Sequence, residues 1–385
     1  MFTFGDYAFY ILFNLLLTTL MFPSTLKRRK STPILSRRIS ASGILLFAAF
    51  VLYVIASSFR MIEPGIGGSD AWAYKAMFYE AEGSSLLAFI GRHTAFEPGF
   101  SLFSWTFYHI VPDYAFALFV WHSLSFILVY RFLTRFATRA HKMTSFLFVY
   151  AVNILLFEQY NTLRMSIAIS VCLNALILFA DGRRVWAVTL VILASSVHVS
   201  AAVILSVFLV YSIMENNSGM TSGKLIATVA ASLVCSLMLI RVFLFLLSAI
   251  GKGVYDDGGA VSLGVYLPLF VLLILGCSRI RNIEEFKYGT ILISALPVCL
   301  GLVPLQMSYS IVYRMTLYFL PVAYAFILML IDAYGANQGC ARKNAPSLEL
   351  GYLMALILGN SYLLYRIISL FVEGAQHFGH FVLAF

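Results

Sequence analysis

The sequence predicts an all-α polytopic membrane protein of about twelve transmembrane helices (roughly 10–13), forming a single integral membrane domain over residues 1–385. Two observations predict this class. Hydrophobic residues make up 61% of the chain and charged residues 11%, with a mean hydropathy of +0.90, whereas a soluble domain carries about twice that charged fraction. Apolar runs long enough to cross the ~30 Å hydrocarbon core also recur along the chain, such as "GILLFAAFVLYVIASSF" from Gly43.

Basic clusters orient these spans. The clusters are "KRRK" from Lys27, "RFLTRFATRAHK" from Arg131, "DGRR" from Asp181, "SRIRNIEEFK" from Ser278 and "ARK" from Ala341. Loops rich in Lys and Arg stay in the cytoplasm. The net charge of +9 therefore reflects membrane topology, and we expect no nucleic-acid partner.

If all five basic clusters lie in the cytoplasm, this determines which apolar runs cross the membrane, and both termini of the chain lie outside the cytoplasm. The predicted spans are 4–22, 42–59, 114–133, 144–160, 165–181, the two halves of 185–211, 225–249, 263–277, 288–306, 314–333 and 350–371. The run 185–211 must be two helices, because one helix would place the loop at Ser278 outside. The break is predicted at "SSVHVS", so that the two halves meet at the outer face.

Residues 61–111 then form an extracytoplasmic loop region. It holds an amphipathic piece, "SDAWAYKAMFYEA" from Ser69, and an apolar piece of 13 residues, "GFSLFSWTFYHIV" from Gly99. Thirteen residues are too few to span a bilayer comfortably. We therefore expect an outer-face segment near 70–111 with amphipathic, interfacial or re-entrant helices.

Polar residues gather at helix ends on the predicted outer face: Asp70, Glu97, Glu158, Arg164, His198 and Arg314. Each acid has a structural interpretation. Asp70 follows glycines and fits a helix cap, and Glu97 precedes Pro98 at a helix start. Glu158 fits a solvated helix-end acid that pairs with Arg164.

The basic residues have structural interpretations too. Arg164 and Arg314 fit headgroup anchors, as do three further arginines placed near helix ends, Arg60, Arg241 and Arg366. His198 fits a structural histidine flanked by serines. Trp72, Tyr74 and Trp105 are typical of an interfacial belt, although such rings also stack on sugars.

Taken together, these residues indicate group transfer from a lipid diphosphate at the outer leaflet. Guanidinium groups bind phosphate oxygens bidentately and stay charged when partly buried. A histidine or a carboxylate can take a proton from an attacking hydroxyl near neutral pH. We expect no cofactor and no metal, because Asp70 has no paired ligand in the sequence and no P-loop, GxGxxG or HExxH pattern occurs.

At these residues the chain resembles the EpsG family of Wzy-type polysaccharide polymerases. The resemblance rests on "GGSDAWAYKAMFYEA", "FEPGFSLFSWTFY", the stretch from Asn161 through "SSVHVS", and "YRMTLYFLPVAY", in that order over roughly residues 65–325. The family often has Arg-Gln at the helix start where this chain has Arg164-Met165. The missing amide weakens any hydrogen-bonding role at that second position.

The resemblance implies a glycosyltransferase of the bacterial inner (cytoplasmic) membrane, with its active face outside the cytoplasm. It would join oligosaccharide repeat units carried on undecaprenyl diphosphate, for O-antigen, capsule or exopolysaccharide. Donor and acceptor are both lipid-linked, and a separate regulator protein is one way to set chain length. On this basis Arg164 and Arg314 bind the donor diphosphate and His198 is the base. Asp70 or Glu97 is the alternative base, or orients the acceptor.

Three other functions stay open at this point. A glycan ligase that uses the same lipid carrier needs the same arginines and base. A transporter or flippase of lipid-linked saccharides fits the broken helix near His198 but predicts an internal repeat, which the sequence does not show. A membrane acyltransferase also needs a histidine, but leaves the outer arginines without a role.

Overall fold

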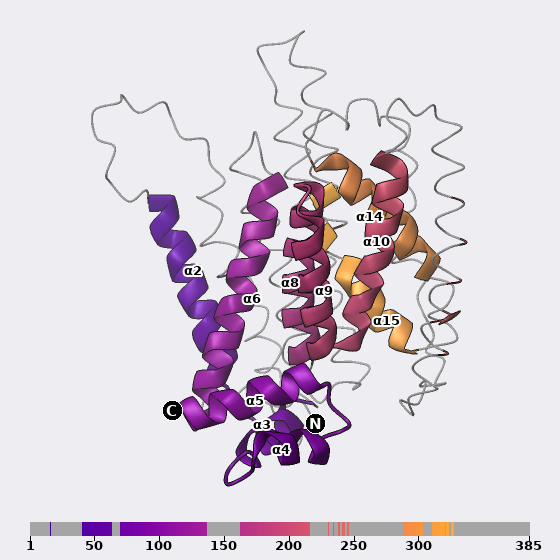
Figure 1. Ribbon diagram of the computed structural model, residues 1–385. Coiled ribbons are helices and arrows are strands. Elements are labelled where there is room, and N and C mark those ends of the chain that lie inside the picture. Colours follow the sequence, from indigo (N-terminus) through magenta and orange to yellow (C-terminus); the bar gives the residue numbers. More distant parts are fainter. Residues whose placement is uncertain are drawn as a thin grey trace, which may run out of the picture. The chain divides into compact units, whose positions relative to one another are not determined.

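The computed structural model describes residues 41–63, 70–136, 162–215, 288–302 and 310–319, together with a few isolated helical residues (Figure 1). All regular elements in these ranges are helices, and none of them is a strand. The chain divides into two compact units, Met1–Ser170 with Lys343–Phe385, and Val171–Arg342. Each unit is treated separately below.

Two helices of the first unit match predicted spans. α2 (Ala41–Ser58) corresponds to 42–59 and α6 (Tyr114–Phe136) to 114–133. The two helices pack along each other, with the rings of Tyr53 and Phe126 5.4 Å apart between centroids (Figure 1). α6 begins where it does because the Asp113 carboxylate accepts hydrogen bonds from two amides of the first turn, at 2.7 and 3.2 Å.

The loop region 61–111 contains three short helices, α3 (Ala71–Tyr79), α4 (Leu86–Arg92) and α5 (Pro98–Ile110). Pro98 occupies the first turn of α5, where a missing N–H costs nothing. The three helices lie together at one end of α6, and α5 runs across the long helices (Figure 1). Both predicted helical pieces are thus confirmed. Their placement outside the membrane stays a prediction.

α8 (Leu163–Ala180) matches the predicted span 165–181 and leads into the second unit. Among the described residues, two segments are long and apolar enough to cross a membrane, Tyr114–Leu133 of α6 and Leu163–Ala180 of α8. The chain is accordingly all-helical over the part that is described, and two of its helices fit membrane spans, while the total of about twelve spans stays a prediction. The predicted spans 144–160, 263–277 and 350–371 lie outside the described residues, and of 4–22 and 225–249 only isolated helical residues are described.

The predicted break in 185–211 is confirmed. α9 (Arg184–Val197) ends at His198, the short 3₁₀ helix η2 (Val199–Val203) follows, and α10 (Ile204–Glu215) continues the chain. The Arg184 guanidinium at the start of α9 pairs with the Glu215 carboxylate at the end of α10. The two helices therefore form an antiparallel hairpin whose turn is at His198.

Three further elements of the second unit are described. α14 (Gly289–Leu302) falls in the predicted span 288–306 and packs against α10. α15 (Ser310–Thr316) begins a few residues before the predicted span 314–333, and η5 (Leu317–Phe319) lies within it. α15 packs against η2. The ends of these two spans lie outside the described residues.

Gly182 allows a test of the turn between α8 and α9. Its φ is +80° and open space surrounds the position of a Cβ, so Gly182→Ala adds only backbone strain. We expect a loss of roughly 1 kcal/mol, seen as a lower midpoint of thermal unfolding in detergent micelles. Gly91→Ala is the matched control, since Gly91 lies within α4 with equal space and no positive φ. Equal midpoints for the two variants would contradict this account of the turn.

Candidate functional site

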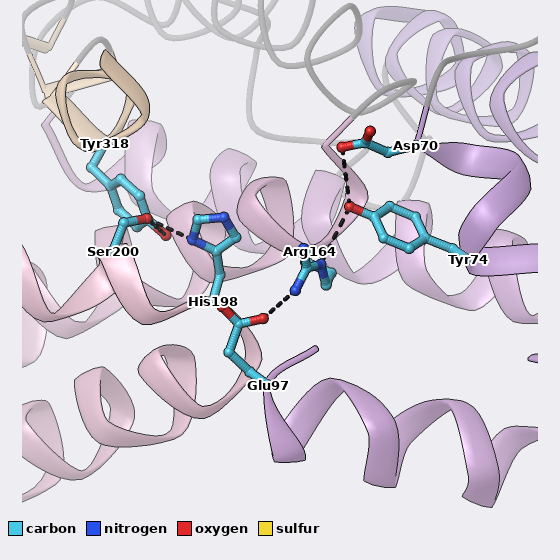
Figure 2. A network of polar contacts seen from close by, with 7 residues as sticks. All are labelled: Asp70, Tyr74, Glu97, Arg164, His198, Ser200 and Tyr318. Atoms are coloured by element: carbon cyan, nitrogen blue, oxygen red, sulfur yellow. Dashed lines mark hydrogen bonds and ion pairs between the residues drawn. The ribbon is translucent and has the colours of Figure 1, made fainter. Parts of the chain in front are cut away.

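Arg164 lies in the first turn of α8 and contacts two side chains from the loop region. Its Nε donates to the Tyr74 hydroxyl at 3.3 Å, and its Nη1 forms an ion pair with the Glu97 carboxylate (Figure 2). The Arg164 side chain is 13% exposed and the Glu97 side chain 9% exposed. A nearly buried guanidinium requires such an anion, because an unpaired charge in a medium of low dielectric is strongly unfavourable.

Three aromatic rings surround the same guanidinium. The centre of the Arg164 guanidinium lies 5.0 Å from the ring centroid of Phe96, 5.3 Å from that of Tyr74 and 5.6 Å from that of Phe100. Phe96 and Phe100 are four residues apart on either side of Glu97, so one segment supplies both the anion and two rings. Cation–π contacts of this kind are stabilising at about 0.5–2 kcal/mol each. We call Arg164, Glu97, Tyr74, Asp70, Phe96 and Phe100 the Arg164 cluster.

Asp70 joins the cluster through Tyr74. The Tyr74 hydroxyl, which accepts from Arg164, donates to the Asp70 carboxylate at 3.5 Å (Figure 2). Asp70 stands at the N-cap position of α3, but its side chain makes no capping hydrogen bond and its backbone is already helical, with φ −89° and ψ −19°. The interpretation of Asp70 as a side-chain cap is therefore wrong.

Glu97 does stand at a helix start, at the N-cap position of α5. It is not a solvated loop acid, however, because it is buried and paired with Arg164. The predicted partner of Arg164, Glu158, lies outside the described residues. The burial of Arg164 also argues against a headgroup anchor, which needs its guanidinium in the polar interface.

Arg164 keeps hydrogen-bonding capacity within this arrangement. A guanidinium has five N–H donors, and the contacts to Tyr74 and Glu97 use two of them. No other residue in the described ranges accepts a hydrogen bond from Arg164. Tyr74 and Glu97 thus hold the guanidinium in one orientation, and among the described contacts its other N–H groups can bind a second anion.

His198 is the centre of a second group of polar residues, in the second unit. Its Nδ1 lies 2.6 Å from the Ser200 hydroxyl, and that hydroxyl donates to the Tyr318 hydroxyl at 3.4 Å (Figure 2). All three residues are buried, with exposed fractions of 6%, 0% and 1%. We call His198, Ser200 and Tyr318 the His198 chain.

The helix break positions the His198 chain. His198 has extended backbone angles, φ −151° and ψ 111°, and ends α9. Tyr318 lies in η5, directly after α15. α15 packs against η2 and also holds Arg314, which is partly buried. Arg314 and His198 therefore lie on or next to elements that pack against each other. That the two residues belong to one site stays a prediction.

The structure thus unites Asp70, Glu97 and Arg164 in one cluster, and places His198 and Arg314 on adjacent elements. Sequence reasoning missed Phe96 and Phe100 as partners of Arg164, and Ser200 and Tyr318 as partners of His198. The spacing of the two phenylalanines around Glu97 was an available signal, whereas the contact to Tyr318 joins residues too far apart in the chain to predict. No group of three or more His, Cys, Asp or Glu side chains that could hold a metal ion occurs in the described ranges.

Arg60 differs from its predicted role as a headgroup anchor. Its side chain is buried, at 5% exposed, and its Nη1 donates to the Ser57 carbonyl. Arg241 is exposed, as an anchor requires. Arg366 lies outside the described residues.

Comparison with known proteins gives one match. The model of the EpsG family matches residues 43–370, which is most of the chain. No curated protein matches the sequence, and no solved structure matches the fold.

The Arg164–Glu97 pair provides a stability test. Glu97→Ala leaves a nearly buried guanidinium without its anion, so we expect a loss of about 3 kcal/mol or more and a clearly lower midpoint of thermal unfolding in detergent. The double variant Glu97→Ala with Arg164→Ala removes both charges and should lose less than the two single losses added together.

Glu80→Ala is the control for this test. Glu80 also pairs with a basic residue, His93 at 3.3 Å, but its side chain is 51% exposed. Exposed pairs contribute about 0–1 kcal/mol, so this variant should unfold close to wild type. Equal effects of Glu80→Ala and Glu97→Ala would show that burial of the Arg164 pair is unimportant.

Proposed function

Since the chain belongs to the EpsG family, whose members are Wzy-type polymerase-like proteins, we propose that it links oligosaccharide repeat units carried on undecaprenyl diphosphate. The reaction takes place at the outer face of the bacterial inner membrane and contributes to polysaccharide biosynthesis. The enzyme is a glycosyltransferase with two lipid-linked substrates, the growing chain as donor and a single repeat unit as acceptor.

The chemistry is a substitution at the first sugar of the donor. A hydroxyl oxygen of the acceptor forms a bond to the anomeric carbon, and the bond from that carbon to the diphosphate oxygen breaks. The bonding electrons leave with undecaprenyl diphosphate, and the hydroxyl proton goes to a base. Positive groups that contact the leaving oxygens stabilise the transition state, because negative charge builds up there.

The observation that carries this proposal is the arrangement around Arg164. The proposed reaction needs a cation at the end of an apolar helix. This cation must be held in a fixed position in which it can bind the donor diphosphate. Arg164 is fixed by Glu97 and Tyr74, surrounded by three rings, and has N–H donors left. Fixed donors are effective in catalysis because they need no reorganisation when the charge develops. Arg314 is proposed as the second diphosphate-binding residue.

His198 is proposed as the base that deprotonates the acceptor hydroxyl. Its competitors are Glu97 and Asp70. Glu97 is the weaker candidate, because its carboxylate is already engaged in the ion pair with Arg164. Glu97 and Asp70 are better suited to orienting Arg164, directly and through Tyr74 respectively.

Arg164→Lys tests the diphosphate-binding role. Lysine keeps a positive charge for Glu97 but lacks the planar fork that binds phosphate bidentately. In cells that lack the native protein, we expect this variant to form polymer at least ~10-fold more slowly and to accumulate single lipid-linked repeat units. Product length is measured by gel electrophoresis of the glycan, and protein level by immunoblot of the membranes.

Arg184→Ala is the matched control for that experiment. Arg184 is an exposed arginine paired with Glu215 at the far end of the α9–α10 hairpin. Its loss should leave the ladder of repeats unchanged. A normal ladder with Arg164→Lys would remove Arg164 from the diphosphate site. A wild type that adds a single glycan without a ladder would indicate the ligase, and one that only moves lipid-linked units across the membrane would indicate the flippase.

His198→Ala tests the base. Loss of a general base lowers a rate by about 10²–10⁴-fold, so we expect the same accumulation of single repeat units at normal protein level. Polymer formation at the wild-type rate would instead assign the base to another residue, with Asp70→Asn as the next variant to measure.

A further inference from the structure

We propose that Ser200 is a positioning residue that fixes His198 in one tautomer, with Tyr318 fixing the Ser200 hydroxyl in turn. The inference rests on the proposed function of His198 as base. It assigns roles to two residues that act through His198.

The argument begins with the single proton of the Ser200 hydroxyl. The Ser200 oxygen lies 2.6 Å from His198 Nδ1 and 3.4 Å from the Tyr318 hydroxyl, and in the proposed arrangement its proton points to Tyr318. Towards His198 Nδ1, 2.6 Å away, the Ser200 oxygen must then act as acceptor. Nδ1 consequently carries the proton. A neutral imidazole has one protonated and one unprotonated nitrogen, so the lone pair is on Nε2.

The helix break makes this contact possible. In a continuous α-helix, side chains two residues apart point in different directions and do not meet. His198 has extended angles and stands at the N-cap position of η2, in which Ser200 is the second residue, so the regular spacing of α9 does not continue through this pair. The interruption of α9 at His198 therefore brings the imidazole and the Ser200 hydroxyl together.

Two serines just before the break behave differently. Ser195 donates to the Val191 carbonyl at 2.8 Å, and Ser196 donates to the Leu193 carbonyl at 2.7 Å. Both bonds are the usual ones for serine within a helix. Ser200 is fully buried. Its hydroxyl instead contacts two other side chains, that of His198, two residues away, and that of Tyr318, which is distant in the sequence. The three serines thus make different hydrogen bonds, although all of them lie within three residues of His198 in the sequence.

The tautomer decides what His198 can do. With its lone pair on Nε2, the imidazole accepts the proton of the acceptor hydroxyl as the hydroxyl oxygen bonds to the anomeric carbon and undecaprenyl diphosphate leaves with the bonding electrons. The imidazolium that forms keeps its Nδ1–H bonded to the Ser200 oxygen. With the proton on Nε2 instead, this nitrogen has no lone pair and cannot act as base.

The direct test is ¹⁵N NMR of the full-length protein, labelled with ¹⁵N-histidine and reconstituted in phospholipid vesicles. His198→Ala identifies the His198 signals. We expect a protonated Nδ1 and an unprotonated Nε2 in the wild type, and a mixture of both tautomers in Ser200→Ala. A protonated Nε2 in the wild type, or a Ser200→Ala spectrum identical to that of the wild type, would overturn the proposal.

Polymer formation in complemented cells gives the second readout. Ser200→Ala should lower the rate about tenfold at normal protein level, which is the size of effect expected from one hydrogen bond. Tyr318→Phe should have a smaller effect, because it leaves the Ser200 oxygen in place. Ser195→Ala is the matched control and should not differ from wild type, since its hydroxyl bonds only to its own helix.

The two readouts separate this inference from the proposed function. A wild type that makes no polymer, with the Nδ1–H tautomer seen by NMR, would overturn the polymerase proposal and support the assignment of Ser200. Normal polymer with Ser200→Ala, at normal protein level, would overturn the role of Ser200 and support the polymerase proposal.

Discussion

The ion pair between Arg164 and Glu97 is the interaction on which the first unit depends. A buried arginine in the first turn of an apolar helix is strongly unfavourable unless an anion lies beside it. Glu97 is that anion, and it comes from the segment between α4 and α5. The pair therefore holds the short helices of the loop region against the start of α8. It also fixes the orientation of a cation where an anionic lipid substrate would bind.

The second unit obeys a related constraint. Polar side chains inside a membrane protein must bond to one another, and His198, Ser200 and Tyr318 do so. This requires an interruption of α9, because a continuous helix would separate the first two side chains. The break thus has two consequences. It reverses the chain into the α9–α10 hairpin, and it places a titratable group at the turn.

Much of this fold was predictable because apolar length and basic loops constrain a membrane chain strongly. α2, α6 and α8 begin and end within about three residues of the predicted spans 42–59, 114–133 and 165–181. The break at "SSVHVS" followed from the requirement that every basic loop stay inside, and the ion pair of Arg184 with Glu215 agrees with it. Of the six polar residues that the sequence groups at the outer face, Arg164, Glu97 and Asp70 lie in one cluster.

The partners of these residues could not be predicted. Whether Arg164 pairs with Glu97 or with Glu158 depends on how the loop region folds back, and hydropathy contains no information about that. The same holds for Tyr318, which is more than 100 residues from Ser200 and meets it only through tertiary packing. Asp70 was misinterpreted as a cap because a carboxylate before a helix usually is one. Here the Asp70 carboxylate accepts a hydrogen bond from the Tyr74 hydroxyl and not from the backbone amides of α3.

The hairpin has a further consequence for access. α9 has 14 residues, which is about 21 Å at 1.5 Å per residue, while the hydrocarbon core is ~30 Å thick. On the predicted topology, which has Arg184 at the inner headgroups, His198 would lie about 9 Å below the outer edge of the core. A sugar attached to a lipid can reach this depth sideways from the leaflet, without passing through bulk water. The low water content at that depth would favour a sugar hydroxyl over water as the attacking group, so the short helix itself would protect the donor from hydrolysis.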